Sequence, residues 1–128
     1  MWLRLHKFAA ALEGATGIAL IASPPIVADL LLGHTVAGVG IALGRVAGIG
    51  LLSLGIACWP ARDGAGLASS RALITYNLLV ALYLFRLGIR GSVGILLWPA
   101  VTMHSVLAIL LLRDGLASTR ESVQNGPA

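Results

Sequence analysis

Four apolar runs follow one another along the chain, and each is about as long as a helix that crosses a lipid bilayer. They cover residues 5–22, 36–59, 72–87 and 93–112. Only 11% of the residues are charged, whereas a soluble domain carries about 25%. So few charges cannot coat a water-facing surface, so we expect residues 1–118 to form one all-α, integral membrane four-helix bundle. No room is left for a soluble catalytic domain.

The connection after the first run has the signals of a short helix. Ser23 suits an N-cap, Pro24 suits the first helical position and Gly33 suits the C-terminal cap. A helix over 25–32 is too short to span, so we expect it to lie along the membrane interface. The polar segment 119–128 is predicted to be a disordered cytoplasmic tail.

Basic residues are unevenly placed around the four runs. One side would hold six of them and the opposite side only two: Arg4, Lys7, Arg62, Arg71, Arg113 and Arg120 against Arg86 and Arg90. Basic residues concentrate on the cytoplasmic side of membrane proteins. We therefore expect both termini in the cytoplasm, in a bacterial inner (plasma) membrane. The same residues are single and scattered, which argues against a nucleic-acid partner and leaves the lipid bilayer as the expected one.

Glycines at a spacing of four lie in the second run, at Gly40, Gly44 and Gly48. Such glycines share one stripe of a helix and let a neighbouring backbone approach closely. The stripe is typical of packing within a bundle, and it also suits a homodimer or a larger membrane complex.

Each run contributes one polar residue at depth, and these are Glu13, Arg45, Asn77 and His104. At 1.5 Å per residue, Glu13, Asn77 and His104 fall within about 5 Å of one another in depth, with Arg45 about 9 Å further out. A charged side chain inside a membrane needs a partner. We therefore expect a contact between Glu13 and Arg45, extended by Asn77 and His104.

This polar cluster has two interpretations. As structural glue it would set the register of the helices through hydrogen bonds. As a proton or substrate site it would use ionisable groups, since such groups inside membranes are often functional and histidine titrates near neutral pH.

Other chemistry finds few residues. His104 is the one histidine at depth and Cys58 the one cysteine, so we expect no haem, other cofactor or metal. Ser105 follows His104 directly and points away from it, so we expect no enzyme. Tyr76, Tyr83 and Arg90 recur at a spacing of seven with Arg86 close by, which favours an interfacial anchor or a lipid headgroup contact at Tyr83, Arg86 and Arg90. Pro99 is predicted to kink the fourth run.

Two resemblances follow from these residues. A lone glutamate in the first span, within Ala11-Leu12-Glu13-Gly14, resembles the small multidrug resistance exporters, over little more than that span. More of the chain is similar to small uncharacterised four-span proteins of high-GC bacteria, through two segments. These are Arg71-Ala72-x-x-x-Tyr76-Asn77-Leu78-x-x-Ala81-Leu82-Tyr83 and Leu97-Trp98-Pro99-Ala100-x-x-x-His104-x-x-Leu107. The second resemblance implies location and fold and no activity.

The expected function is that of a non-enzymatic accessory or assembly partner in the membrane. The alternative is a small solute transporter or proton-linked channel that uses the same polar cluster. A water-filled cavity reaching Glu13 from one side would favour transport, and a closed core would favour the accessory role.

Overall fold

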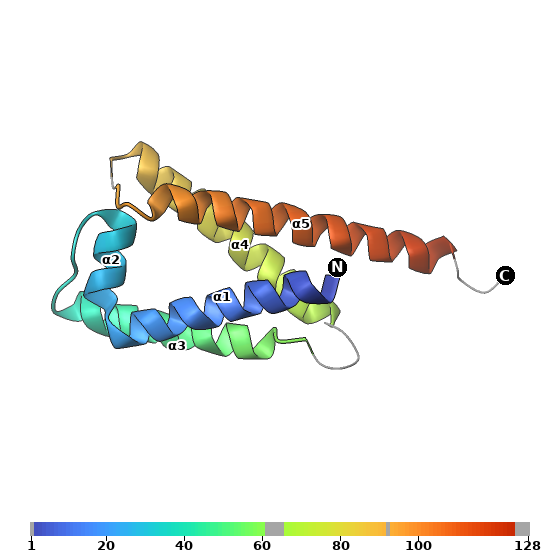
Figure 1. The fold of residues 1–128 in the computed structure, drawn as a ribbon, viewed down its shortest axis with the longest axis horizontal. Helices are drawn as coiled ribbons and strands as arrows, with labels where there is room; N and C mark the ends of the chain where they lie inside the picture. The colour runs from blue at the N-terminus through green and yellow to red at the C-terminus, as the bar shows by residue number, and fades with distance from the viewer. Residues whose placement is uncertain (1, 61–65, 92, 125–128) are drawn as a thin grey trace.

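A computed structural model describes residues 2–60, 66–91 and 93–124. Within these residues the chain is helical and forms five helices (Figure 1). In chain order they are α1 (Trp2–Ala22), α2 (Pro24–Leu32), α3 (Val39–Ala57), α4 (Leu67–Ile89) and α5 (Leu97–Gln124). Four are long and apolar enough to cross a membrane, over Leu3–Ala22, Val39–Ala57, Leu67–Ile89 and Leu97–Leu116. The expected all-α four-helix bundle is confirmed, and the chain has the features of a multi-pass membrane protein.

The four long helices form two antiparallel pairs. Figure 1 shows α1 lying beside α3 along its length, and α4 crossing and packing against α5. Between the two pairs, contacts are far fewer. The helix α2 lies across one end of the molecule and joins α1 to the turn before α3. The two pairs must therefore be held together by a small number of specific contacts.

Glycines bring α1 and α3 into backbone contact. A Cβ atom added to Gly48 would lie 2.7 Å from the carbonyl oxygen of Gly17, and one added to Gly55 would lie 2.7 Å from that of Ala10. Gly44 packs against the ring of Pro24. The atoms nearest to a Cβ added at Gly40 belong to Val36, which comes before α3. Of the predicted stripe, Gly44 and Gly48 thus pack within the chain, and Gly55 extends the contact where Gly40 does not.

The helix α2 ends as its sequence indicates. Gly33 has a positive φ of 73°, and its N–H donates to the carbonyl of Asp29 at 2.8 Å. Ser23 is the N-cap residue, although its side chain makes no capping hydrogen bond. Leu31 and Leu32 pack against a small core between α4 and α5 that contains Leu84, Leu97 and Val101.

Backbone hydrogen bonds tie the end of α2 to the second helix pair. The N–H groups of Gly94 and Leu96 donate to the carbonyls of Leu31 and Leu30, at 3.2 and 2.8 Å. These carbonyls belong to the last turn of α2, where no helical donor is left for them. Gly94 also lies so close to Leu30 that a side chain would collide with its carbonyl. Segment 93–96 thus ties the end of α2 to the start of α5 through backbone hydrogen bonds, and we call it the clamp.

The same clamp explains why two predictions about α5 are wrong at its start. The fourth span was expected from residue 93, but the helix begins at Leu97 because the preceding residues bond to α2. Pro99 consequently lies in the first turn of α5. N–H groups in the first turn have no acceptor within the helix, so the missing N–H of proline costs no helical hydrogen bond there. Only Leu97 and Trp98 of α5 precede Pro99, so there is no helical segment that the proline could kink, and this prediction is wrong.

The other end of α5 also differs from the prediction. The helix continues to Gln124, so residues 119–124 are helical and not the expected disordered tail. The segment contains Arg120, Glu121 and Gln124, which favour helices, and its strong helix breakers come only at Gly126 and Pro127. Residues 125–128 lie outside the described part of the chain.

A main core lies at the end of the bundle where the chain begins. It contains Ala9, Ala10, Cys58, Leu73, Leu107 and Leu111, which come from α1, α4, α5 and the end of α3. Many large apolar side chains elsewhere are exposed, among them Leu43, Ile49 and Leu82. In a bilayer such residues face lipid tails, so an exposed apolar surface is expected here.

The glycine contact between α1 and α3 gives a test of the fold. We expect Gly48→Ala to lower the free energy of unfolding by about 2 kcal/mol, because the added methyl group collides with α1 backbone atoms. Gly50→Ala is the matched control, since nothing lies within 4 Å of a Cβ at Gly50. Denaturant unfolding in detergent micelles measures both. Equal losses for the two variants would contradict the close packing.

Candidate functional site

Glu13 is buried at the centre of the molecule, on the side of α1 that faces the second helix pair. Its side chain is 1% exposed. Among the described residues, neither of its carboxylate oxygens has a hydrogen-bond partner. A buried carboxylate without hydrogen bonds is costly, so this group is the most unusual one in the bundle.

His104 on α5 lies beside Glu13. Its Nδ1 lies 3.9 Å from Oε1 of Glu13, and 2.8 Å from Oδ1 of Asn77 on α4. The Asn77 amide is oriented by a second bond, in which Nδ2 donates to the carbonyl of Leu73 at 2.9 Å. Oδ1 must therefore accept, and Nδ1 of His104 must carry the hydrogen. This arrangement fixes the ring beside Glu13.

Tyr76 completes the cluster from α4. Its ring meets the ring of His104 edge-on, with centroids 6.0 Å apart and an interplanar angle of 76°. Its hydroxyl faces the carboxyl group of Glu13, although no hydrogen bond of normal geometry joins them. The sequence spacing grouped Tyr76 with the interfacial residues Tyr83 and Arg90, whereas the structure turns it inward.

The expected contact between Glu13 and Arg45 is wrong. Arg45 is exposed on α3, and its neighbour Gly44 packs against Pro24 at the α2 end. Pro24 is eleven residues from Glu13 along the chain, which corresponds to roughly 16 Å of helix. Counting residues predicts the depth of a side chain but not the direction in which it points. The packing of α1 on α3 instead turns Arg45 outward.

The structure therefore brings together three of the four predicted polar residues. Glu13, Asn77 and His104 meet, with Tyr76 added and Arg45 removed. Their elements are α1, α4 and α5, so the cluster joins the first helix pair to the second. Tyr83, Arg86 and Arg90 are exposed along the last part of α4. A contact of these three residues with lipid headgroups stays a prediction.

A second polar contact lies two helical turns from the first and was missed by the sequence reasoning. His6 is 1% exposed, and its Nε2 lies 3.0 Å from Oγ of Ser70. His6 precedes Glu13 by seven residues, and Ser70 precedes Asn77 by seven. Residues seven apart share one face of a helix, so this spacing could have predicted that His6 faces α4.

The arrangement can hold a proton between Glu13 and His104. In the Glu13–His104 pair, a neutral acid beside a neutral imidazole and a carboxylate beside an imidazolium have the same total charge. The two states differ in where one proton sits, on the carboxyl group of Glu13 or on Nε2 of His104, because Nδ1 already carries the hydrogen that it donates to Asn77. In the described part of the chain, no three His, Cys, Asp or Glu residues are grouped closely enough to hold a metal ion. Cys58 is buried, and its Sγ lies 3.6 Å from the carbonyl oxygen of Ser69.

Comparison with known proteins yields no relative. No family model matches the chain, and no curated protein or solved structure matches it significantly. The resemblances to small four-span bacterial proteins and to the small multidrug resistance exporters accordingly stay predictions.

Asn77 provides a test of this site. We expect Asn77→Leu to lower the free energy of unfolding by about 2 kcal/mol, because Nδ1–H of His104 would be left buried without an acceptor. The control is Thr102→Val, since Thr102 is exposed and its hydroxyl bonds only the carbonyl of Trp98 in its own helix. Unfolding in detergent measures both. An unchanged stability of Asn77→Leu would contradict the described contact.

Proposed function

We propose that this protein is a non-enzymatic accessory or assembly partner for a larger complex in a bacterial inner membrane. The observation that supports this role is the closure of the polar cluster. Glu13 has no exposed surface, and its two oxygens are out of reach of solvent. A transport site must open to at least one side of the membrane. A closed cluster instead suits a structural contact that holds the two helix pairs together.

Polar contacts between the two helix pairs are needed for a physical reason. Lipid tails are as apolar as leucine side chains, so apolar burial does little to hold membrane helices together. Contacts between the two pairs are few, and polar groups supply several of them. These are Glu13 with His104 near the middle, His6 with Ser70 towards one end, and the backbone clamp of residues 93–96 at the other.

We propose that both termini lie in the cytoplasm. In the bundle, Arg4 and Lys7 near the start of α1 lie at the same end as Arg71 near the start of α4. Arg45, Arg86 and Arg90 belong towards the α2 end. Arg113 follows Leu111 of the core at the first end, so the positive-inside rule supports this orientation.

The partner would pack against α3. Only 11% of the α3 span is buried, compared with 28% for each of the other three. Its outer face carries an exposed stripe at helical spacing, which consists of Val46, Gly50, Ser53 and Ala57. Small residues at such spacing are the usual contact surface between membrane helices. We propose that a transmembrane helix of the partner lies on this stripe.

One observation favours the second candidate, a proton-linked transporter. Both oxygens of Glu13 lack hydrogen bonds among the described residues. A residue with a purely structural role would be expected to make such bonds. A carboxyl group beside His104 could take up and release a proton if another conformation opened the cluster to water. The two candidates differ in whether the chain acts alone.

Purification from native membranes in mild detergent tests the proposal. We expect one stoichiometric membrane protein to accompany the chain, because α3 leaves its small-residue stripe uncovered. Gly50→Leu should remove this protein by filling the stripe. Leu79→Phe enlarges a residue that is exposed on α4, so it serves as the control and should keep the partner.

Two results would contradict the accessory role. One is a chain that purifies alone in wild-type form. The other is proton flux into liposomes that contain only this chain, if that flux exceeds protein-free liposomes and disappears in Glu13→Gln. The second result would establish the transporter.

A further inference from the structure

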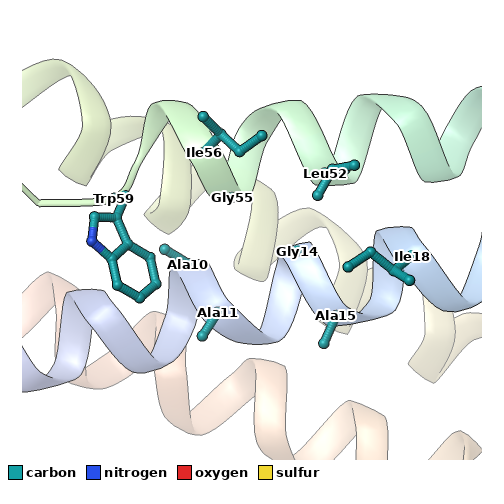
Figure 2. Close-up of a pocket in the computed structure, with 9 residues that line it drawn as sticks. All are labelled: Ala10, Ala11, Gly14, Ala15, Ile18, Leu52, Gly55, Ile56 and Trp59. Carbon is teal, nitrogen blue, oxygen red and sulfur yellow. The ribbon is translucent and has the colours of Figure 1, made fainter.

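An apolar groove runs between α1 and α3 on the surface that faces away from the polar cluster. Its volume is about 600 Å³. Figure 2 shows small residues of α1 along it, Ala11, Gly14 and Ala15, bordered by the larger side chains of Ile18, Ile56 and Trp59. The indole of Trp59 lies at one end, between the end of α3 and α1. None of the residues of the cluster lines this groove.

The groove has the length of one bilayer leaflet. It follows α1 from Ala10 to Ile18, and the eight steps between these residues correspond to roughly 12 Å of helix. Half the hydrocarbon core of a bilayer is about 15 Å thick. Trp59 is 54% exposed, and tryptophan is typical of the level of the lipid headgroups. The groove therefore extends from one headgroup layer towards the middle of the membrane.

Two cations stand beyond the Trp59 end of the groove, on the same face of α1. Lys7 precedes Ala11 by four residues and Arg4 precedes it by seven, so all three share one stripe. Both cations are exposed, and neither forms an ion pair within the described part of the chain. The acid Glu13 does not neutralise them, because it lies on the opposite side of α1.

We propose that this groove binds one anionic glycerophospholipid. An acyl chain lies in the groove, and Lys7 and Arg4 bind the phosphate-bearing headgroup beside Trp59. The ligand follows from complementarity, since the site is apolar for the length of one leaflet and positively charged only where that leaflet carries its phosphates. The bilayer supplies this molecule at this depth. The proposal goes beyond the partner role and involves neither the polar cluster nor the outer stripe of α3.

Native mass spectrometry of the purified chain tests this site. Dioleoylphosphatidylglycerol and dioleoylphosphatidylcholine are added in equal amounts to protein in a neutral detergent. We expect one phosphatidylglycerol per chain to be retained in preference to phosphatidylcholine. Replacing both cations, as Arg4→Gln with Lys7→Gln, should weaken phosphatidylglycerol binding about tenfold or more and abolish the preference. Ala15→Phe fills the groove and should reduce the binding of both lipids.

The chain offers a control that removes the same charge at the same depth. Lys7 lies six residues from Glu13 and Arg71 six from Asn77, while Arg4 lies nine from Glu13 and Arg113 nine from His104. Since Glu13, Asn77 and His104 meet at one level, the double variant Arg71→Gln with Arg113→Gln is matched in depth. We expect it to retain the lipid and the preference.

Three results would overturn the proposal. An equal loss of lipid in the control variant would mean that binding follows net charge alone. Retention in Ala15→Phe would mean that the groove holds no acyl chain. A dimer that dissociates in Ala15→Phe would mean that a second copy occupies the groove. Circular dichroism checks that the variants stay folded, which we expect because all the replaced side chains are exposed.

Discussion

The two helix pairs of this protein are joined by a polar contact between Glu13 of one pair and His104 of the other. Asn77 lies at the same level and binds His104. Each pair is well built by itself. Glycines bring α1 and α3 together at backbone distance, and α4 and α5 share a core. Between the pairs the lipid provides no drive for association. The relative position of the pairs therefore depends on the polar cluster, on His6 with Ser70, on the clamp at α2, and on the packing in the main core that the pairs share.

Much of this could be predicted, because a helix rises by a constant amount per residue. Counting residues from the span ends placed Glu13, Asn77 and His104 at one depth, and they meet. Counting does not tell which way a side chain points. That depends on the packing of α1 on α3, where Gly48 and Gly55 face inward and Arg45 consequently faces out. Tyr76 was misassigned for the same reason.

The ends of the elements were harder to predict than their centres, since they depend on contacts distant in sequence. The start of α5 is set by hydrogen bonds from Gly94 and Leu96 to α2, which no local pattern reveals. The groove on α1 was likewise invisible to the sequence. Ala11 and Ala15 of α1 form it together with Trp59, which comes from a distant segment of the chain. One face of α1 thus carries Glu13 of the polar cluster, and the opposite face carries the proposed lipid site.

A double-mutant cycle on Glu13 and His104 tests the central claim most directly. The free energies of unfolding of the wild type, Glu13→Ala, His104→Ala and the double variant would be measured in the same detergent. If the two residues join the helix pairs, their effects will not add, and a coupling energy of about 1 kcal/mol is expected for side chains in contact. Additive effects, with a coupling of zero within error, would contradict the account.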